Sequence, residues 1–507
     1  MGIKLFLLIL FFAVMVGVGF YSRRHVKSVD GFVLGGRSVG PWLTAFAYGT
    51  SYFSAVVFVG YAGQFGWKYG IASTWIGIGN ALIGSLLAWV VLGRRTKVMT
   101  QHLRAKTMPD FFGQRYGSKA LKIVASVIVF VFLIPYTASV YNGLSRLFGM
   151  AFNIPYTWCV IAMAVFTAIY VILGGYMATA INDFIQGIIM LFGIVAVIAS
   201  VLNGQGGFME AVSKMAQIPS DVPATMGQPG AFTSFFGPDP LNLLGVVILT
   251  SLGTWGLPQM IGKFYAIKDE KSINTGTVIS TLFAIVISGG CYFLGGFGRL
   301  FDSAEIYNAE TGAVVYDSII PSMLSKLPDI LIGIVVVLVL SASMSTLSSL
   351  VLTSSSTMTL DLLKDNIMKE MSEKKQIITM QILIVFFIVV SVVIALDPPT
   401  FIAQLMGISW GALAGAFLAP FLYGLYWKGV TRAGVWAGFI AGVGITVSNM
   451  FTGYIESPIN AGAAAMVAGL VIVPLVSLVT PKLKKEDVDE IFTCYEEKVV
   501  STKKRNL

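Results

Sequence analysis

One uncharged stretch of the chain carries an unusual density of hydroxyl side chains. The segment 337–360 reads VLVLSASMSTLSSLVLTSSSTMTL, and no charged residue occurs from Ile330 to Leu360. Residues three, four and seven positions apart share one face of a helix. Here that face carries Ala342, Ser345, Thr346 and Ser349. Because an isolated hydroxyl can simply bond to a carbonyl of its own helix, the row matters more than any one member. Hard alkali cations prefer oxygen ligands, so the row favours Na⁺ over a transition metal.

Two other apolar stretches are interrupted by residues that form helices poorly. AYGTSYFSAVVF, residues 47–58, lies within an uncharged run from Ser38 to Trp67, and LNLLGVVILTSLGTWGLPQMIGK covers residues 241–263. Small residues of this kind also allow close helix packing. Unwound backbone at membrane depth is tolerated only beside a cavity or a bound ligand. Matching interruptions in two halves therefore favour a transport site near the midplane.

Asp183, in GGYMATAINDFIQG, is the one carboxylate within the body of an expected span. An ionisable residue at that depth is by default a functional-site hypothesis. The alternative is an acid near a helix amino terminus that answers the helix dipole.

These residues must be positioned by helices that cross a membrane. The chain has 507 residues, of which 56% are hydrophobic and 12% charged, far fewer charges than a soluble domain carries. About 20 apolar residues span a bilayer as a helix. We expect an all-α polytopic protein with about 13 spans: 3–21, 41–62, 71–92, 121–147, 156–175, 178–203, 241–262, 274–300, 329–356, 377–396, 399–426, 432–452 and 459–480.

The spacing of the two interrupted spans predicts an inverted repeat. They are the second and the seventh spans, and a unit of five spans re-enters the membrane from the opposite side. We expect one transporter domain over 1–480, with repeats at about 41–203 and 241–426, and a tail at 481–507. The helices 3–21, 432–452 and 459–480 are peripheral. Glycines at 407, 411 and 415 and at 434, 438 and 442 predict helix contacts.

Basic residues set the orientation. Of the 34 Lys and Arg residues, six lie outside the loops after spans 1, 3, 7, 9 and 11 and the tail: Lys4, Lys68, Arg146, Lys214, Arg299 and Lys326. The positive-inside rule predicts an outside amino terminus and a cytoplasmic carboxyl terminus in a multi-pass protein of the plasma membrane. The net charge of +9 therefore requires no nucleic acid.

Several motifs together resemble the sodium:solute symporter family. They are FVLGGRSVGPWLTAFAYGTSYFS, TMPDFFGQRYG, LGGYMATAINDFIQG, WGLPQMIGKFYAIKD and SASMSTLSS, and the resemblance covers nearly the whole chain. It implies the leucine-transporter fold, with five plus five inverted helices. It also implies a Na⁺ site built from carbonyls of the second span and carbonyls and hydroxyls of the ninth. The matching positions are Thr50, Phe53, Ala342, Ser345 and Thr346.

Some members of that family bind a second Na⁺. The matching positions here are Asp183, Ser345, Ser348 and Ser349, and the sequence leaves one or two Na⁺ per cycle open. For the solute, the resemblance to proline carriers implies Ser54 and Tyr136. Those carriers have Asp where this chain has Tyr52, and aromatic residues where it has Thr250 and Thr254. Trp255 and Gln259 are neighbouring candidates.

The resulting hypothesis is Na⁺-coupled import of a small organic solute, such as an amino acid, carboxylate, vitamin or sugar, by alternating access. The alternatives are a proton-coupled symporter of the same fold and a membrane sensor that acts through a partner. The tail, a solvated mixed-charge segment, is too short for an enzymatic domain. No nucleotide-binding or nucleophile motif and no ligand cluster indicates an enzyme or a cofactor. The oligomeric state is left open.

Overall fold

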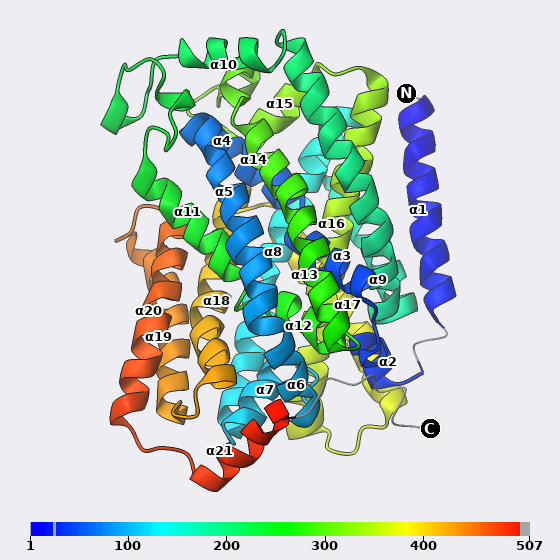
Figure 1. Cartoon of the computed structure of the whole chain (residues 1–507). Coiled ribbons are helices and arrows are strands. Elements are labelled where there is room, and N and C mark those ends of the chain that lie inside the picture. Colours follow the sequence, from blue (N-terminus) through cyan, green and yellow to red (C-terminus); the bar gives the residue numbers. More distant parts are fainter. Residues whose placement is uncertain (1, 24–26, 497–507) are drawn as a thin grey trace.

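A computed structural model describes residues 2–23 and 27–496. In these residues the chain is helical, and the β-type pairings are two isolated bridges, Val39 with Ile267 and Tyr307 with Val314. The long helices run between two ends of the molecule (Figure 1). Helices α10 and α15 lie at one end, called here the α10 end, and α6, α7 and α21 lie at the other, called the α7 end.

The first half of the chain contains α1 (Gly2–Ser22), α2 (Val29–Leu34), α3 (Pro41–Tyr52), η3 (Val56–Tyr61), α4 (Ala62–Tyr69), α5 (Thr74–Gly79), η5 (Asn80–Leu87), η6 (Trp89–Gly93), α6 (Arg94–His102), α7 (Met108–Arg115), α8 (Lys119–Phe152), α9 (Tyr156–Gly204) and α10 (Phe208–Ala216). The second half contains α11 (Pro240–Gly253), α12 (Pro258–Ala266), α13 (Glu270–Ala284), η9 (Ile285–Gly289), α14 (Gly290–Gly295), α15 (Ile319–Ser325), α16 (Asp329–Thr357), η13 (Met358–Ile367), α17 (Glu373–Leu396), α18 (Ile402–Tyr426), α19 (Arg432–Thr452), α20 (Pro458–Val479), α21 (Lys485–Phe492) and η14 (Thr493–Glu496). Short helical turns join them: η2 (Gly35–Arg37), η4 (Gly70–Ser73), η7 (Pro223–Thr225), η8 (Ala231–Thr233), η10 (Gly298–Phe301), η11 (Ala304–Ile306) and η12 (Tyr316–Ser318).

By length and composition, 11 helical segments of the described chain are able to cross a membrane. Two of them, Val56–His102 with 47 residues and Tyr156–Gly204 with 49, are each about twice as long as a bilayer requires. Each contains a glycine with left-handed φ between two expected spans: Gly70 at φ 61° and Gly175 at φ 53°. Each long segment therefore contains residues of two expected spans, because the chain reverses at the glycine without an intervening loop. Two such mergers account for the difference between the 13 expected spans and the 11 segments.

Both expected interruptions are present, which confirms that part of the prediction. Helix α3 ends at Tyr52, and Phe53 is extended, with φ −100° and ψ 121°. Helix α11 ends at Gly253, and Leu257 is extended, with φ −86° and ψ 122°, before Pro258 begins α12. Each break follows a run of Gly, Ser and Thr, whose helix propensity is low.

The glycine-rich faces form helix contacts, as expected. A Cβ added to Gly442 of α19 would lie 2.1 Å from the backbone nitrogen of Ala416 in α18, and one on Gly411 would lie 2.6 Å from Gly462 of α20. Helix α18 therefore packs directly on α19 and α20, and it is buried along most of its length.

The tail differs from the solvated segment that the sequence indicates. Helix α21 and η14 pack against α6, Lys428 pairs with Asp489 at 2.6 Å, and the Tyr495 hydroxyl donates to the Leu425 carbonyl at 2.9 Å. Val488 and Cys494 are both buried, among charged residues that made this part of the sequence look solvated. The rest of the expected tail, residues 497–507, lies outside the described residues.

Candidate functional site

The break in α3 is held open by hydroxyl groups. The Ser54 hydroxyl accepts the Val56 amide at 3.2 Å, and the Ser343 hydroxyl of α16 accepts the Ala55 amide at 3.2 Å. These two acceptors cap the restart of the helix at η3, as Ser and Thr do at helix amino termini. The carbonyls just before the restart are therefore free to face α16.

Five of the predicted residues come together at this break. The Ser345 hydroxyl oxygen lies 2.9 Å from the Thr50 carbonyl oxygen and 3.0 Å from that of Ala342. The Thr346 hydroxyl oxygen lies 3.3 Å from the Thr50 carbonyl oxygen, 3.1 Å from that of Phe53 and 3.1 Å from that of Ala342. It also lies 3.4 Å from the Ser51 carbonyl oxygen, which the sequence did not single out.

This cluster has more acceptors than hydrogens. Four carbonyl oxygens face two hydroxyls, each with a single hydrogen to donate, and the Phe53 amide adds one hydrogen bond, to the Thr50 carbonyl at 3.2 Å. Thr50, Ser345 and Thr346 are fully buried, so the remaining lone pairs have little access to water. A small hard cation satisfies such a set of neutral oxygens better than hydrogen bonds do. The donor set therefore fits Na⁺ as cargo.

The second predicted set has a different environment. Asp183 of α9 is fully buried, and neither of its carboxylate oxygens has a hydrogen-bond partner among the described residues. The Lys263 ammonium lies 3.8 Å from Asp183 Oδ2 and donates to the Ser349 hydroxyl at 3.0 Å. Ser348 is used within its own helix, where it donates to the Ser345 carbonyl at 2.9 Å. The positive charge of Lys263 thus stands between two of the predicted ligands.

Sequence reasoning missed Lys263 because its expected span ended one residue earlier. The sequence analysis therefore placed Lys263 in the basic loop after the seventh span. In the structure it belongs to α12, within the membrane-crossing segment Pro240–Ala266, and is buried. This correction changes the charge balance around Asp183.

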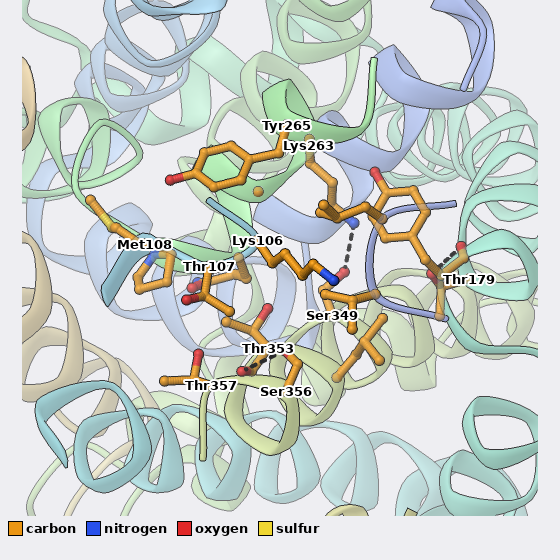
Figure 2. A pocket seen from close by; sticks show the side chains of 17 residues that line it. Lys106, Thr107, Met108, Thr179, Lys263, Tyr265, Ser349, Thr353, Ser356 and Thr357 are labelled. Carbon is orange, nitrogen blue, oxygen red and sulfur yellow. Dashed lines mark hydrogen bonds between the residues drawn. The ribbon is translucent and has the colours of Figure 1, made fainter. Parts of the chain in front are cut away.

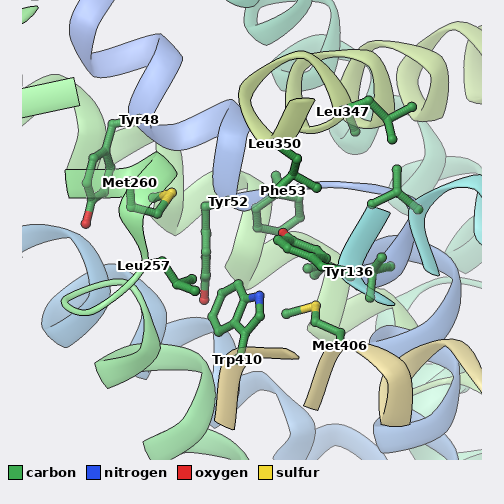
Figure 3. Packing of buried hydrophobic residues seen from close by; sticks show 14 of the residues in the cluster. Tyr48, Tyr52, Phe53, Tyr136, Leu257, Met260, Leu347, Leu350, Met406 and Trp410 are labelled. Carbon is green, nitrogen blue, oxygen red and sulfur yellow. The ribbon is translucent and has the colours of Figure 1, made fainter. Parts of the chain in front are cut away.

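Two of the predicted solute residues, Tyr52 and Tyr136, lie beside Trp410 of α18 (Figure 3), and Ser54 lies beside Tyr136. The Trp410 ring centroid lies 5.8 Å from that of Tyr52 and 5.9 Å from that of Tyr136. The Tyr136 hydroxyl lies close enough to Ser54 and Trp410 to interact with both, although neither it nor the Trp410 indole N–H has a described partner in good hydrogen-bond geometry. Tyr52 donates to the Thr250 carbonyl at 3.2 Å and so connects the first break to α11.

The other three predicted solute residues lie elsewhere. The Thr254 hydroxyl donates to the Gly84 carbonyl at 3.0 Å, and the Trp255 indole donates to the Ile83 carbonyl at 2.9 Å. Both side chains are therefore held against η5. Gln259 lines a separate cavity of about 40 Å³, together with Lys263 and Ser349 (Figure 2).

Further buried hydroxyls near the break were not predicted. The Tyr61 and Tyr292 side chains lie near those of Tyr52 and Tyr136, and Tyr292 also lies near Asn80, but neither hydroxyl has a described partner in good hydrogen-bond geometry. A buried polar group without a partner is rare. Tyr61 lies fourteen residues after the start of the interrupted stretch, and no spacing pattern singles it out. Trp410 lies in a glycine-rich helix, whose pattern indicates only helix packing.

No group of three or more His, Cys, Asp or Glu in residues 2–23 and 27–496 is arranged to hold a metal ion. The polar groups at the breaks are hydroxyls, carbonyls, an amide, an indole and one charge pair.

Comparison with known proteins gives a consistent result. Residues 32–442 match the sodium:solute symporter family. A sodium/proline symporter of Staphylococcus aureus (strain JH9) is 30% identical over 495 residues, covering 94% of this chain and 92% of the relative, and that of strain NCTC 8325 / PS 47 matches equally.

Two solved structures share the fold. A substrate-bound, outward-open Na⁺-coupled sialic acid symporter superposes with a TM-score of 0.74 at 15% identity, covering 95% of this chain and 99% of the other. Mhp1, a nucleobase-cation-symport-1 family transporter in a closed conformation, gives a TM-score of 0.53 at 13% identity, covering 91% and 98%. The likeness confirms the expected leucine-transporter-like, all-helical architecture.

Proposed function

The chain belongs to the sodium:solute symporter family and is a Na⁺-coupled membrane symporter rather than an enzyme, and we propose that its coupling ion binds where α3 breaks beside α16. The ligands are the carbonyls of Thr50, Phe53 and Ala342 and the hydroxyls of Ser345 and Thr346. The single observation that carries this proposal is the shortage of hydrogens among these buried oxygens.

The same unwound segment supplies the solute site in this proposal. Tyr52 and Ser54 flank Phe53, whose carbonyl is a Na⁺ ligand, so Na⁺ and solute order adjacent atoms of one short segment. Each therefore tightens the binding of the other, because the coupling free energy between two sites is reciprocal. The repeats at about 41–203 and 241–426 then move around this site, with the α7 end facing the cytoplasm as its positive charge favours.

The proposed solute is a small organic molecule recognised through a carboxylate. Unpaired O–H and N–H donors of Tyr136 and Trp410 face the position between α3 and α18, and a carboxylate accepts several such hydrogen bonds. Tyr52 supplies no negative charge to pair with an ammonium. Simple monocarboxylates therefore come first among the candidates and amino acids follow, ahead of sugars; L-proline is included because a relative is a sodium/proline symporter.

A thermal-shift screen tests the proposal. Purified protein is heated with L-proline, other amino acids, monocarboxylates, vitamins and sugars, in Na⁺ and in matched choline. The proposal predicts that at least one carboxylate raises the melting temperature in Na⁺ and has little effect in choline. Equal stabilisation by a solute in Na⁺ and in choline would contradict Na⁺ coupling. Stabilisation by sugars alone would contradict the proposed solute class.

The two alternatives make different predictions. A proton-coupled symporter of this fold responds to pH and not to the replacement of Na⁺ by choline at constant pH. A sensor binds its solute without flux across vesicle membranes. Family membership and the oxygen cluster both favour Na⁺-coupled symport.

A further inference from the structure

Lys263 joins the two broken helices through buried polar contacts. It lies on α12, the second part of the α11–α12 break, and its ammonium donates to Ser349 of α16 at 3.0 Å. The Ser349 and Ser51 hydroxyl oxygens are 2.7 Å apart. The ammonium can only donate, so Ser349 accepts from it, and either the Ser349 or the Ser51 hydroxyl donates the second hydrogen bond, beside the α3 break. Figure 2 shows the Lys263 side chain directed toward Ser349.

The charges around this position balance without an added ion. Lys263 is 5% exposed and Asp183 is fully buried, so both charges lie away from water. The other cation lining the same cavity, Lys106, is paired with Asp30 at 2.8 Å. The ammonium also lies 5.2 Å from the centroid of the Tyr176 ring, whose face attracts cations. One carboxylate thus faces one ammonium.

A metal cation bound by both Asp183 and Ser349 would have to occupy the position of the Lys263 ammonium. Oxygen ligands approach a cation of this size to about 2.3–2.6 Å. The ammonium lies close to both oxygens, at 3.0 Å from Ser349 Oγ and 3.8 Å from Asp183 Oδ2. A Na⁺ placed there would contact another positive charge with no second carboxylate to compensate. The residues therefore do not fit a second Na⁺ while Lys263 is charged and in place.

We propose that the Lys263 ammonium is a tethered cation that replaces a second Na⁺ beside Asp183, so that the protein binds one Na⁺ per transport cycle. This inference rests on the proposed Na⁺ site at the α3 break. The tether gives Asp183 a permanent partner, and it links α12 to α3 through Ser349 and Ser51. Only the ion at the α3 break is then exchanged with the solution.

Equilibrium binding of radioactive Na⁺ to the purified full-length protein tests the proposal without a known solute. We expect wild type to bind one Na⁺ per chain, with ionic strength held constant by choline. Lys263→Gln frees Asp183 and is expected to raise the number to two. Lys263→Arg, which keeps the cation, and the paired neutral variant Asp183→Asn with Lys263→Gln are both expected to bind one.

The outcomes separate this inference from the proposed function. Two Na⁺ bound to wild type would overturn the tethered cation and leave the α3 site intact. One Na⁺ in wild type and still one in a folded Lys263→Gln would overturn it as well. No Na⁺ bound to wild type would instead refute the proposed site at the α3 break. If Lys263→Gln does not fold, Lys263→Met, which also removes the charge and keeps Asp183, takes its place with the same expected result and the same contradicting result.

Discussion

Removing the two hydroxyls of the oxygen cluster is the sharpest perturbation of the proposed Na⁺ site. Ser345→Ala combined with Thr346→Ala deletes two of five ligands and leaves the three carbonyls in place. A hydrogen bond or ligand contact to a charged group contributes about 1.5–3 kcal/mol. Each hydroxyl gives up about 1 kcal/mol of existing hydrogen bonding to carbonyls when the ion binds. The net loss is therefore about 1–4 kcal/mol for the pair.

That loss corresponds to a roughly 5- to 700-fold weaker Na⁺ affinity, since about 1.4 kcal/mol is a factor of ten. The assay is Na⁺ titration of the melting temperature of purified protein in choline of constant ionic strength. Thr346→Ser keeps the hydroxyl and is expected to stay within a few-fold of wild type.

Ser391→Ala is the matched control. Its hydroxyl is also buried but bonds only to the Phe387 carbonyl of its own helix, at 2.9 Å. We expect its Na⁺ titration to match that of wild type. A double variant of Ser345 and Thr346 that folds and titrates like wild type would refute the reasoning, because the cluster would then be a packing contact.

Three further predictions address the solute site, the packing and the pH response. Tyr136→Phe removes a buried hydroxyl and is expected to weaken solute binding roughly 10-fold or more, while Na⁺ binding in the absence of solute is unchanged. Tyr141→Phe, which removes another buried hydroxyl of the same helix, is the control. Equal effects of the two variants on solute binding would contradict the assignment of Tyr136 to the solute site. Gly442→Ala places a Cβ 2.1 Å from the backbone of α18 and is expected to lower the free energy of unfolding by about 1–3 kcal/mol, measured as a lower melting temperature. Gly444→Ala, whose Cβ would have nothing within 4 Å, is expected to have little effect. Similar decreases in melting temperature for both variants would argue against the contact. Burial raises the pKa of Asp317 to about 6, so the folded state favours the protonated acid: its stabilisation is complete below about pH 4 and is lost as the pH rises through about 6. The melting temperature of wild type relative to Asp317→Asn is therefore expected to fall between pH 4 and pH 7, and a flat difference would contradict the shift.

The first break and the hydroxyl face were predictable because each leaves a local signal. Gly49, Thr50 and Ser51 interrupt an otherwise apolar helix, and the spacing of Ser345 and Thr346 follows the helical period. These properties are read from neighbouring residues alone. The contacts of both hydroxyls with the Thr50 carbonyl then follow from placing the two elements side by side.

What the sequence could not supply depends on tertiary placement. Lys263 reads as a loop charge because depth in the membrane is not encoded by its neighbours, and only the packing of α12 on α16 brings it to Ser349. Thr254 and Trp255 lie in the second break as expected, but their polar atoms turn toward carbonyls of η5. Trp410 lies against Gly253, where a Cβ would come within 2.5 Å of its ring, and this contact joins spans distant in the sequence.

The central claim is that a Na⁺ gradient drives solute uptake through the site at the α3 break. The most direct measurement reconstitutes wild type and the Ser345→Ala, Thr346→Ala variant in liposomes and follows uptake of the carboxylate that stabilises the protein. The account predicts that an inward Na⁺ gradient makes wild type accumulate the solute above its external concentration, while the variant needs far more Na⁺. Uptake by wild type that is the same in Na⁺ and in choline would contradict it.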